Sequence, residues 1–120
     1  MTAAEGPETP AHHREETGST NIDARNAFAA GTRSAHWYTA TRQTAGVGRR
    51  GRPWVQEDGN FAGTLLWPIA QEDLRRPALF SFVAAIALCD ALEKLGVPSA
   101  DIKVKWPNDV LLGGRKGAGI

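Results

Sequence analysis

A glycine- and arginine-rich segment, residues 46–54, is the part of this chain best suited to chemistry. It reads Gly-Val-Gly-Arg-Arg-Gly-Arg-Pro-Trp. Glycines let a backbone approach a ligand closely, and arginines are permanently charged planar donors that suit phosphate or carboxylate. A hydrogen bond to a charged group contributes about 1.5–3 kcal/mol, so two arginines on one phosphate would dominate local affinity. The segment predicts an anion site, while a solvated basic loop and an RNA-binding segment stay open as alternatives.

The glycine spacing in this segment also matches G-x-G-x-x-G, which binds dinucleotides between a strand and a helix. The residues that follow, 52–60, include Pro53 and Gly59 and show no helical period. A kinase-type glycine loop would have valine where Pro53 stands. We therefore set both of these nucleotide-binding interpretations aside.

A second candidate site is the run Lys105-Trp106-Pro107-Asn108-Asp109. Lys105 lies near the end of an alternating stretch and Pro107 forces a turn, so we expect the ammonium group at a fixed rim. Such a lysine can orient a ligand carboxylate and neutralise charge as the carboxylate attacks phosphorus. Asn108 and Asp109 either cap the turn or contact nucleotide and magnesium, and both interpretations stay open.

The third candidate is Ser19-Thr20-Asn21. By itself this run predicts the N-cap of a helix. A helix N-terminus also presents free backbone amides, which suit the polar head of a ligand.

The pattern along the chain predicts the elements that position these residues. Ser19 and Gly31 bracket a helix, and Pro77 opens a second helix that ends near Leu95 and is expected to be packed on most sides. The remaining expectations are strands at 35–41, 61–67 and 102–106, an irregular segment at 42–60, and a hairpin of 110–112 with 118–120 around Gly113-Gly114.

Composition narrows the function classes. The chain has 120 residues, 42% of them hydrophobic and 22% charged, with a net charge of +1, which gives no global attraction to nucleic acid. The single cysteine, Cys89, indicates a reducing compartment, so the cytoplasm is expected. No segment has the pattern of a signal peptide or a membrane span.

The N-terminal stretch, residues 1–16, is expected to be a disordered leader because it is polar and lacks periodicity. It is too short for a helix-turn-helix, so no DNA partner is expected. His12 and His13 are interpreted as tail residues rather than metal ligands. Residues 17–120 are expected to form one domain, and the apolar end at Ile120 favours a fragment of a larger fold.

Four segments, taken in order, resemble the biotin protein ligase family, and the pairing of GRRGR with KWPND is specific to it. They are ETGSTN (16–21), RQTAGVGRRGRPW (42–54), KWPNDVLL (105–112) and RKGAGI (115–120). The resemblance implies an α/β domain of the α+β type, a mixed sheet with packed helices as in class II synthetases. Residues 17–120 would be its N-terminal part, truncated before further strands and a small β-barrel.

The same resemblance implies a reaction and its participants. Biotin and ATP, with Mg²⁺ on the nucleotide, would give biotinyl-5′-AMP, and biotin would then pass to a lysine of a biotin carboxyl carrier domain. No membrane partner is expected, and a homodimer stays open. The rival interpretations are a nucleic-acid-binding module that uses the arginine loop and an inactive fragment that binds biotin without activating it.

Roles for individual residues also follow from the resemblance. Arg49 and Lys105 are the catalytic candidates, Lys116 has a supporting role, and no metal ligand is expected. The residues implied in biotin binding are Ser19, Thr20, Asn21, Gln43, Val47, Gly48, Arg49 and Lys105. Those implied in nucleotide binding are Gly46, Arg52, Trp54, Asn108 and Asp109. Val47 stands where the family usually has arginine, so only its backbone can contribute.

Overall fold

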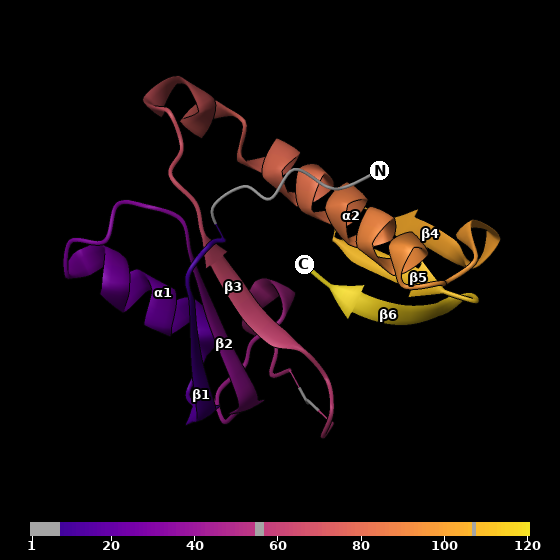
Figure 1. Cartoon of the computed structure of the whole chain (residues 1–120), viewed down its shortest axis with the longest axis horizontal. Helices are drawn as coiled ribbons and strands as arrows, with labels where there is room; N and C mark the ends of the chain where they lie inside the picture. The colour runs from indigo at the N-terminus through magenta and orange to yellow at the C-terminus, as the bar shows by residue number, and fades with distance from the viewer. Residues whose placement is uncertain (1–7, 55–56, 107) are drawn as a thin grey trace. The chain divides into compact units, whose positions relative to one another are not determined.

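The computed structural model describes residues 8–54, 57–106 and 108–120. The chain divides into two compact units, Met1–Pro68 and Ile69–Ile120, which we call unit 1 and unit 2. Each unit combines a helix with a three-stranded sheet (Figure 1). This mixed α/β architecture confirms the predicted fold class.

Unit 1 is built around two parallel strands joined through a helix. β1 (Ala11–Thr17) runs parallel to β2 (His36–Gln43), and α1 (Thr20–Ala29) connects them. β3 (Ala62–Leu66) pairs antiparallel with the other edge of β2, so the strand order is β1-β2-β3. The helix predicted after Ser19 and the two predicted strands are thereby confirmed.

The core of unit 1 consists of small side chains. Ala24 of α1, Ala40 of β2 and Ala62 of β3 are all buried, and α1 contacts both of these strands. Because alanine occupies little space, the helix backbone can lie close to the sheet. The start of α1 is therefore held near the ends of the strands.

Part of the predicted leader is a strand. Residues 11–16, expected to be disordered, belong to β1, while residues 1–7 lie outside the described residues. Only Thr17 of β1 is buried, so the strand has no apolar pattern that could reveal it. Backbone pairing with β2, from Ala11 opposite Trp37 to Thr17 opposite Gln43, holds it in the sheet.

The irregular segment predicted at 42–60 is shorter than expected. β2 continues through Gln43, and an isolated bridge joins Val47 to Pro53. Arg42, the first arginine of the basic run, forms an ion pair with Glu16 of β1. A neighbouring strand therefore supplies an acid that the run itself lacks, which counts against a continuous nucleic-acid-binding surface.

Unit 2 consists of one long helix and an antiparallel sheet. α2 (Pro77–Lys94) is followed by β4 (Ile102–Lys105), β5 (Asp109–Leu112) and β6 (Arg115–Gly119), paired in that order. Short 3₁₀ turns occupy Gln71–Arg75 and Ser99–Asp101.

The hairpin predicted around two adjacent glycines is confirmed, but its second strand begins at Arg115 rather than at residue 118. Gly113 and Gly114 join β5 to β6 and have φ values of 56° and 82°. Positive φ at both central residues is what a type I′ turn requires, and glycine adopts it without steric cost.

The expectation that α2 is packed on most sides is wrong. Ala85 is the only residue of α2 that is buried, while Val83 is 62% exposed and Ile86 is 59% exposed. Within unit 2 the helix contacts β4 and β5, which cover one side of it. In the described part of the chain, no helix is both long and apolar enough to cross a bilayer.

Candidate functional site

The parallel pairing of β1 and β2 brings two of the candidate segments together. Just after β2, the amide of Thr44 donates to the carbonyl of Thr17 at 2.9 Å, and that of Ala45 donates to the carbonyl of Gly18 at 2.8 Å. The carboxyl ends of parallel strands lie at one edge of a sheet, which is where α/β proteins commonly bind ligands. Ser19, which follows β1 after Gly18, is 5% exposed.

Gln43, at the end of β2, holds the start of α1. Its Oε1 accepts the backbone amide of Thr20 at 2.8 Å and the Thr20 hydroxyl at 3.1 Å. Ser19 occupies the predicted N-cap position but its side chain makes no capping hydrogen bond. Gln43 of the neighbouring strand satisfies the first amide of the helix instead, which is a different amide from those that an N-cap side chain would bond.

Two further polar side chains complete this arrangement. The hydroxyl of Thr64, on β3, lies 2.8 Å from the Thr20 hydroxyl and donates to Oδ1 of Asn21 at 2.5 Å. We call Thr20, Asn21, Gln43 and Thr64 the polar cluster. Sequence reasoning missed Thr64, since a lone threonine in a strand carries no motif.

The first turn of α1 is also tied to β1. The hydroxyl of Thr17 donates to Oδ2 of Asp23 at 2.7 Å. Arg14 faces the other carboxylate oxygen at 3.8 Å, and because the arginine is largely exposed this ion pair contributes little. Asp23, another residue that sequence reasoning missed, thus fixes the helix start from the side opposite the polar cluster.

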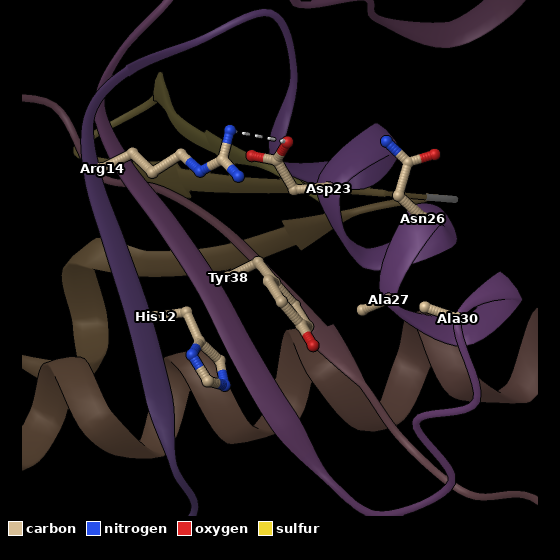
Figure 2. Close-up of a pocket in the computed structure, with 7 residues that line it drawn as sticks. All are labelled: His12, Arg14, Asp23, Asn26, Ala27, Ala30 and Tyr38. Atoms are coloured by element: carbon tan, nitrogen blue, oxygen red, sulfur yellow. Dashed lines mark ion pairs between the residues drawn. The ribbon is translucent and has the colours of Figure 1, made fainter.

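Two grooves run along the flanks of α1. The groove on the β1 side has a volume of about 400 Å³ and contains none of the predicted site residues (Figure 2). It is lined by His12, Arg14, Asp23, Asn26, Ala27, Ala30 and Tyr38. The groove on the β3 side, of about 390 Å³, includes Asn21 and Thr64 in its wall. The polar cluster is therefore accessible from the flank next to β3.

The glycine-arginine loop is a narrow closed hairpin. The amide of Gly48 donates to the carbonyl of Arg52 at 2.6 Å, and that of Trp54 donates to Gly46 at 2.8 Å. Arg50 and Gly51, at the tip, have positive φ values of 59° and 71°. The backbone is thus ordered by its own hydrogen bonds before any ligand binds.

The side chains of this hairpin face solvent where they are described. Val47 is 59% exposed, Trp54 is 41% exposed, and Arg52 is exposed. The side chain of Arg49, predicted to be catalytic, lies outside the described part of the structure. Because these side chains are exposed and the backbone is ordered, they can contact a ligand that lies against the hairpin.

Gly46 connects the hairpin to the polar cluster. A Cβ at this position would lie 3.1 Å from Nε2 of Gln43 and 3.7 Å from Cβ of Trp54. We therefore expect Gly46→Ala to push the Gln43 amide and weaken its bond to the Thr20 amide. In the free protein, hydrogen exchange of that amide should become several-fold faster, while the free energy of unfolding changes by about 1 kcal/mol or less.

Gly18→Ala is the matched control for that prediction, because a Cβ at Gly18 meets nothing within 4 Å. Equal exchange rates at the Thr20 amide in the two variants would contradict the link between Gly46 and Gln43.

In unit 2, the predicted Lys105 turn places charges side by side. Lys105 is exposed at the end of β4 and pairs in register with Asp109, the first residue of β5. Asp109 also forms an ion pair with Lys116 of β6, with Nζ and Oδ1 3.1 Å apart. Lys105 and Lys116 thus belong to the two strands that flank the strand of Asp109. Pro107, which the sequence predicts at this turn, lies outside the described residues.

Asn108 and Trp106, two residues of this turn, both make contacts within the fold. Asn108 donates from Nδ2 to the carbonyl of Ile120 at 3.1 Å and accepts the Ile120 amide at 2.8 Å. These bonds favour a structural role for Asn108 at the end of the sheet. Trp106 packs on Phe82 of α2, with ring centroids 4.5 Å apart, so it also has a structural partner.

The sheet of unit 2 has a charged face and an apolar face. Cross-strand pairing puts Lys103 and Lys105 on the same face as Leu111 and Asp109, since neighbours opposite each other share a face. Val110, which points the other way, is completely buried. The described residues contain no group of three or more side chains that could hold a metal ion.

The predicted site residues therefore fall into two sets, each within one unit. Unit 1 brings Thr20, Asn21 and Gln43 together with Gly46 next to them, and unit 2 brings Lys105, Asp109 and Lys116 together.

Comparison with known proteins gives consistent matches. Residues 17–120 match the model of the biotin/lipoate A/B protein ligase family. A biotin--[acetyl-CoA-carboxylase] ligase of Paracoccus denitrificans is 51% identical over 104 residues, which cover 87% of this chain and 42% of that protein. The chain thus spans less than half the length of this relative.

Solved structures agree. The biotin protein ligase from Leishmania major in complex with biotin superposes with a TM-score of 0.74 and 30% identity, over 88% of this chain and 48% of that one. The same enzyme in complex with biotinyl-5-AMP gives a TM-score of 0.71 and 29% identity, over 89% and 49%. These likenesses confirm the predicted catalytic-domain fold.

Proposed function

This chain belongs to the biotin/lipoate A/B protein ligase family, and from that premise we propose that residues 17–120 form the N-terminal part of the catalytic domain of an ATP-dependent biotin protein ligase. The single observation that carries the proposal is the polar cluster, in which Gln43 and Thr20 meet at the start of α1. Donors and acceptors concentrated at a helix start suit a small polar ring.

The ureido ring of biotin has one carbonyl acceptor and two N–H donors, and the polar cluster supplies groups of both kinds. Within the described residues, no hydrogen bond engages the backbone amides of Asn21 and Ile22. Such amides at a helix N-terminus favour an acceptor. Ser19, Thr20, Asn21 and Gln43 would therefore bind the ureido end of biotin.

The reaction would have two steps. An oxygen of the biotin carboxylate attacks the α-phosphorus of ATP, and pyrophosphate leaves. The amine of a carrier lysine then attacks the acyl carbon, AMP leaves, and the amine loses its proton. Cationic groups stabilise the charge that develops in both steps, and this role is assigned to Arg49 and Lys105, supported by Lys116.

The remaining binding groups are assigned as the sequence predicts. The backbone of Val47 and Gly48 would contact biotin, and Gly46, Arg52 and Trp54 would contact the nucleotide. Asp109, which forms an ion pair with Lys116 in the structure, would also contact the nucleotide. Because the described residues lack a metal cluster of their own, Mg²⁺ would arrive on the phosphates of ATP. The acceptor would be the lysine of a biotin carboxyl carrier domain in the cytoplasm.

Biotin-dependent exchange between ATP and pyrophosphate tests this proposal, measured on a protein extended beyond residue 120 to the length of its relatives. Exchange that requires biotin is the expected result. A folded protein that shows none would contradict the proposal, and binding of biotin without exchange would identify a biotin-binding protein instead.

Lys105→Ala in the extended protein is expected to lower the exchange rate by about 100-fold, the effect of removing one preorganised donor from a developing charge. The melting temperature should change little, because Lys105 is exposed. Lys103→Ala is the matched control, since Lys103 lies on the same strand and the same face. A wild-type rate in Lys105→Ala would remove this lysine from the mechanism.

A further inference from the structure

Thr64 occupies a position in the polar cluster that no motif predicts. Its hydroxyl lies between the hydroxyl of Thr20 and the side-chain amide of Asn21, on a strand remote in sequence from both. Thr20 is only 3% exposed, so its hydrogen-bonding choices are limited to these neighbours and a bound ligand.

Thr20 and Thr64 have too few hydroxyl hydrogens for all of their contacts, so the directions of their hydrogen bonds depend on one another. Thr20 and Thr64 have one hydroxyl hydrogen each, but their oxygens take part in three contacts, with each other, with Gln43 and with Asn21. If Thr64 donates to Oδ1 of Asn21, Thr20 donates to Thr64. Gln43 then accepts the Thr20 amide alone.

The opposite direction is equally consistent with the heavy atoms. If Thr20 donates to Gln43, Thr64 donates to Thr20, and Asn21 turns its amide so that Nδ2 donates to Thr64. In the first pattern Asn21 keeps Nδ2 for a ligand, and in the second it keeps Oδ1. The direction of the Thr64 hydroxyl therefore decides whether Asn21 offers a donor or an acceptor.

We propose that Thr64 is a positioning residue that sets which hydrogen-bonding groups Thr20 and Asn21 present to the ureido ring of biotin. This inference rests on the proposed function. The ureido ring both accepts and donates hydrogen bonds, so Thr20 and Asn21 must present a matching donor and acceptor. Thr64 links these two side chains because its hydroxyl has a single hydrogen. Thr64 thereby contributes to selection between a ureido ring and its imino analogue, in which a donor replaces the carbonyl.

Thr64→Val tests the proposal because it removes the hydroxyl and keeps the shape of the side chain. In the 120-residue chain without ligand, the NMR signals of the Asn21 side-chain amide should move towards those of a freely rotating amide. Biotin affinity in isothermal titration should fall about tenfold, a factor that corresponds to about 1.4 kcal/mol. The ratio of biotin to iminobiotin affinity should fall with it.

Two further variants make the result specific. Thr64→Ser keeps the hydroxyl and should restore both the Asn21 signals and the biotin preference. Thr39→Val removes a hydroxyl from the neighbouring strand that bonds to His13 instead, and should change neither. If Thr64→Val fails to fold, Thr64→Ala provides a second side chain without a hydroxyl.

The outcomes separate this inference from the function on which it rests. Unchanged Asn21 signals and unchanged ligand preference in a Thr64→Val protein that binds biotin would overturn the role of Thr64 alone. A folded wild-type chain, and a folded extended protein, that bind no biotin would overturn the proposed function and the ureido selectivity with it.

Discussion

Replacing Gln43 by leucine is expected to weaken biotin binding by at least about 100-fold, because more than one polar contact is lost at a half-buried side chain. Oε1 of Gln43 accepts the Thr20 amide and lies 3.1 Å from the Thr20 hydroxyl, and leucine of similar size offers an acceptor to neither. A buried donor left without a partner costs about 1–3 kcal/mol, so the free energy of unfolding should fall by a similar amount. Isothermal titration with biotin and thermal unfolding of the same samples measure the two effects.

Two other variants separate binding from folding at this position. Gln43→Glu keeps an oxygen for Thr20 and adds a negative charge near the start of α1, so the fold should be retained. The variant lacks the amide donor, so biotin binding should still weaken. Gln71→Leu, at an exposed glutamine in unit 2, is the matched control and should bind as the wild type does. Wild-type affinity in Gln43→Leu would show that this site does not bind the ligand.

Arg49→Ala in the extended protein is expected to lower the yield of enzyme-bound biotinyl-adenylate by about 100-fold, the effect of removing one charged donor from a phosphate site. The fold should be unaffected. The hairpin around Arg49 is closed by the bonds Gly48 to Arg52 and Trp54 to Gly46, which involve only the backbone. Adenylate that remains bound after gel filtration, together with the melting temperature, tests both parts.

Arg50→Gly is the control at the adjacent position. Glycine adopts the positive φ of Arg50 without strain, so this variant removes a neighbouring cation and leaves the turn intact. Its adenylate yield should stay close to that of the wild type. Equal losses in the two variants would mean that the loop acts through its total charge rather than through Arg49.

The parts of the fold that the sequence predicts are those with local signals. Gly113-Gly114 specifies a tight turn, Pro77 specifies a helix start, and both elements form where they are expected. β1 escapes prediction because its exposed polar residues resemble a tail, and only pairing with β2 makes them a strand. The exposure of Val83 and Ile86 on α2 likewise depends on what surrounds the helix.

The candidate site likewise contains residues that the sequence identifies and residues that only the structure reveals. Gln43 and Thr20 are found through a motif, but their bond depends on the parallel pairing of β1 with β2. Thr64 and Asp23 have no sequence signal, since their roles arise from contacts with residues on other elements. Sequence patterns identify the segments of a site, whereas the partners that orient them come from tertiary structure.

The parallel arrangement of β1 and β2 also determines when a site can appear during synthesis. Glu16 and Arg42, paired across these strands, are 26 positions apart, and Thr20 and Thr64 are 44 positions apart. Such contacts require closure of long loops and form more slowly than a helix does. A ribosome that has made α1 has therefore made no polar cluster, and the proposed biotin site can form only after β3 has emerged and joined the sheet.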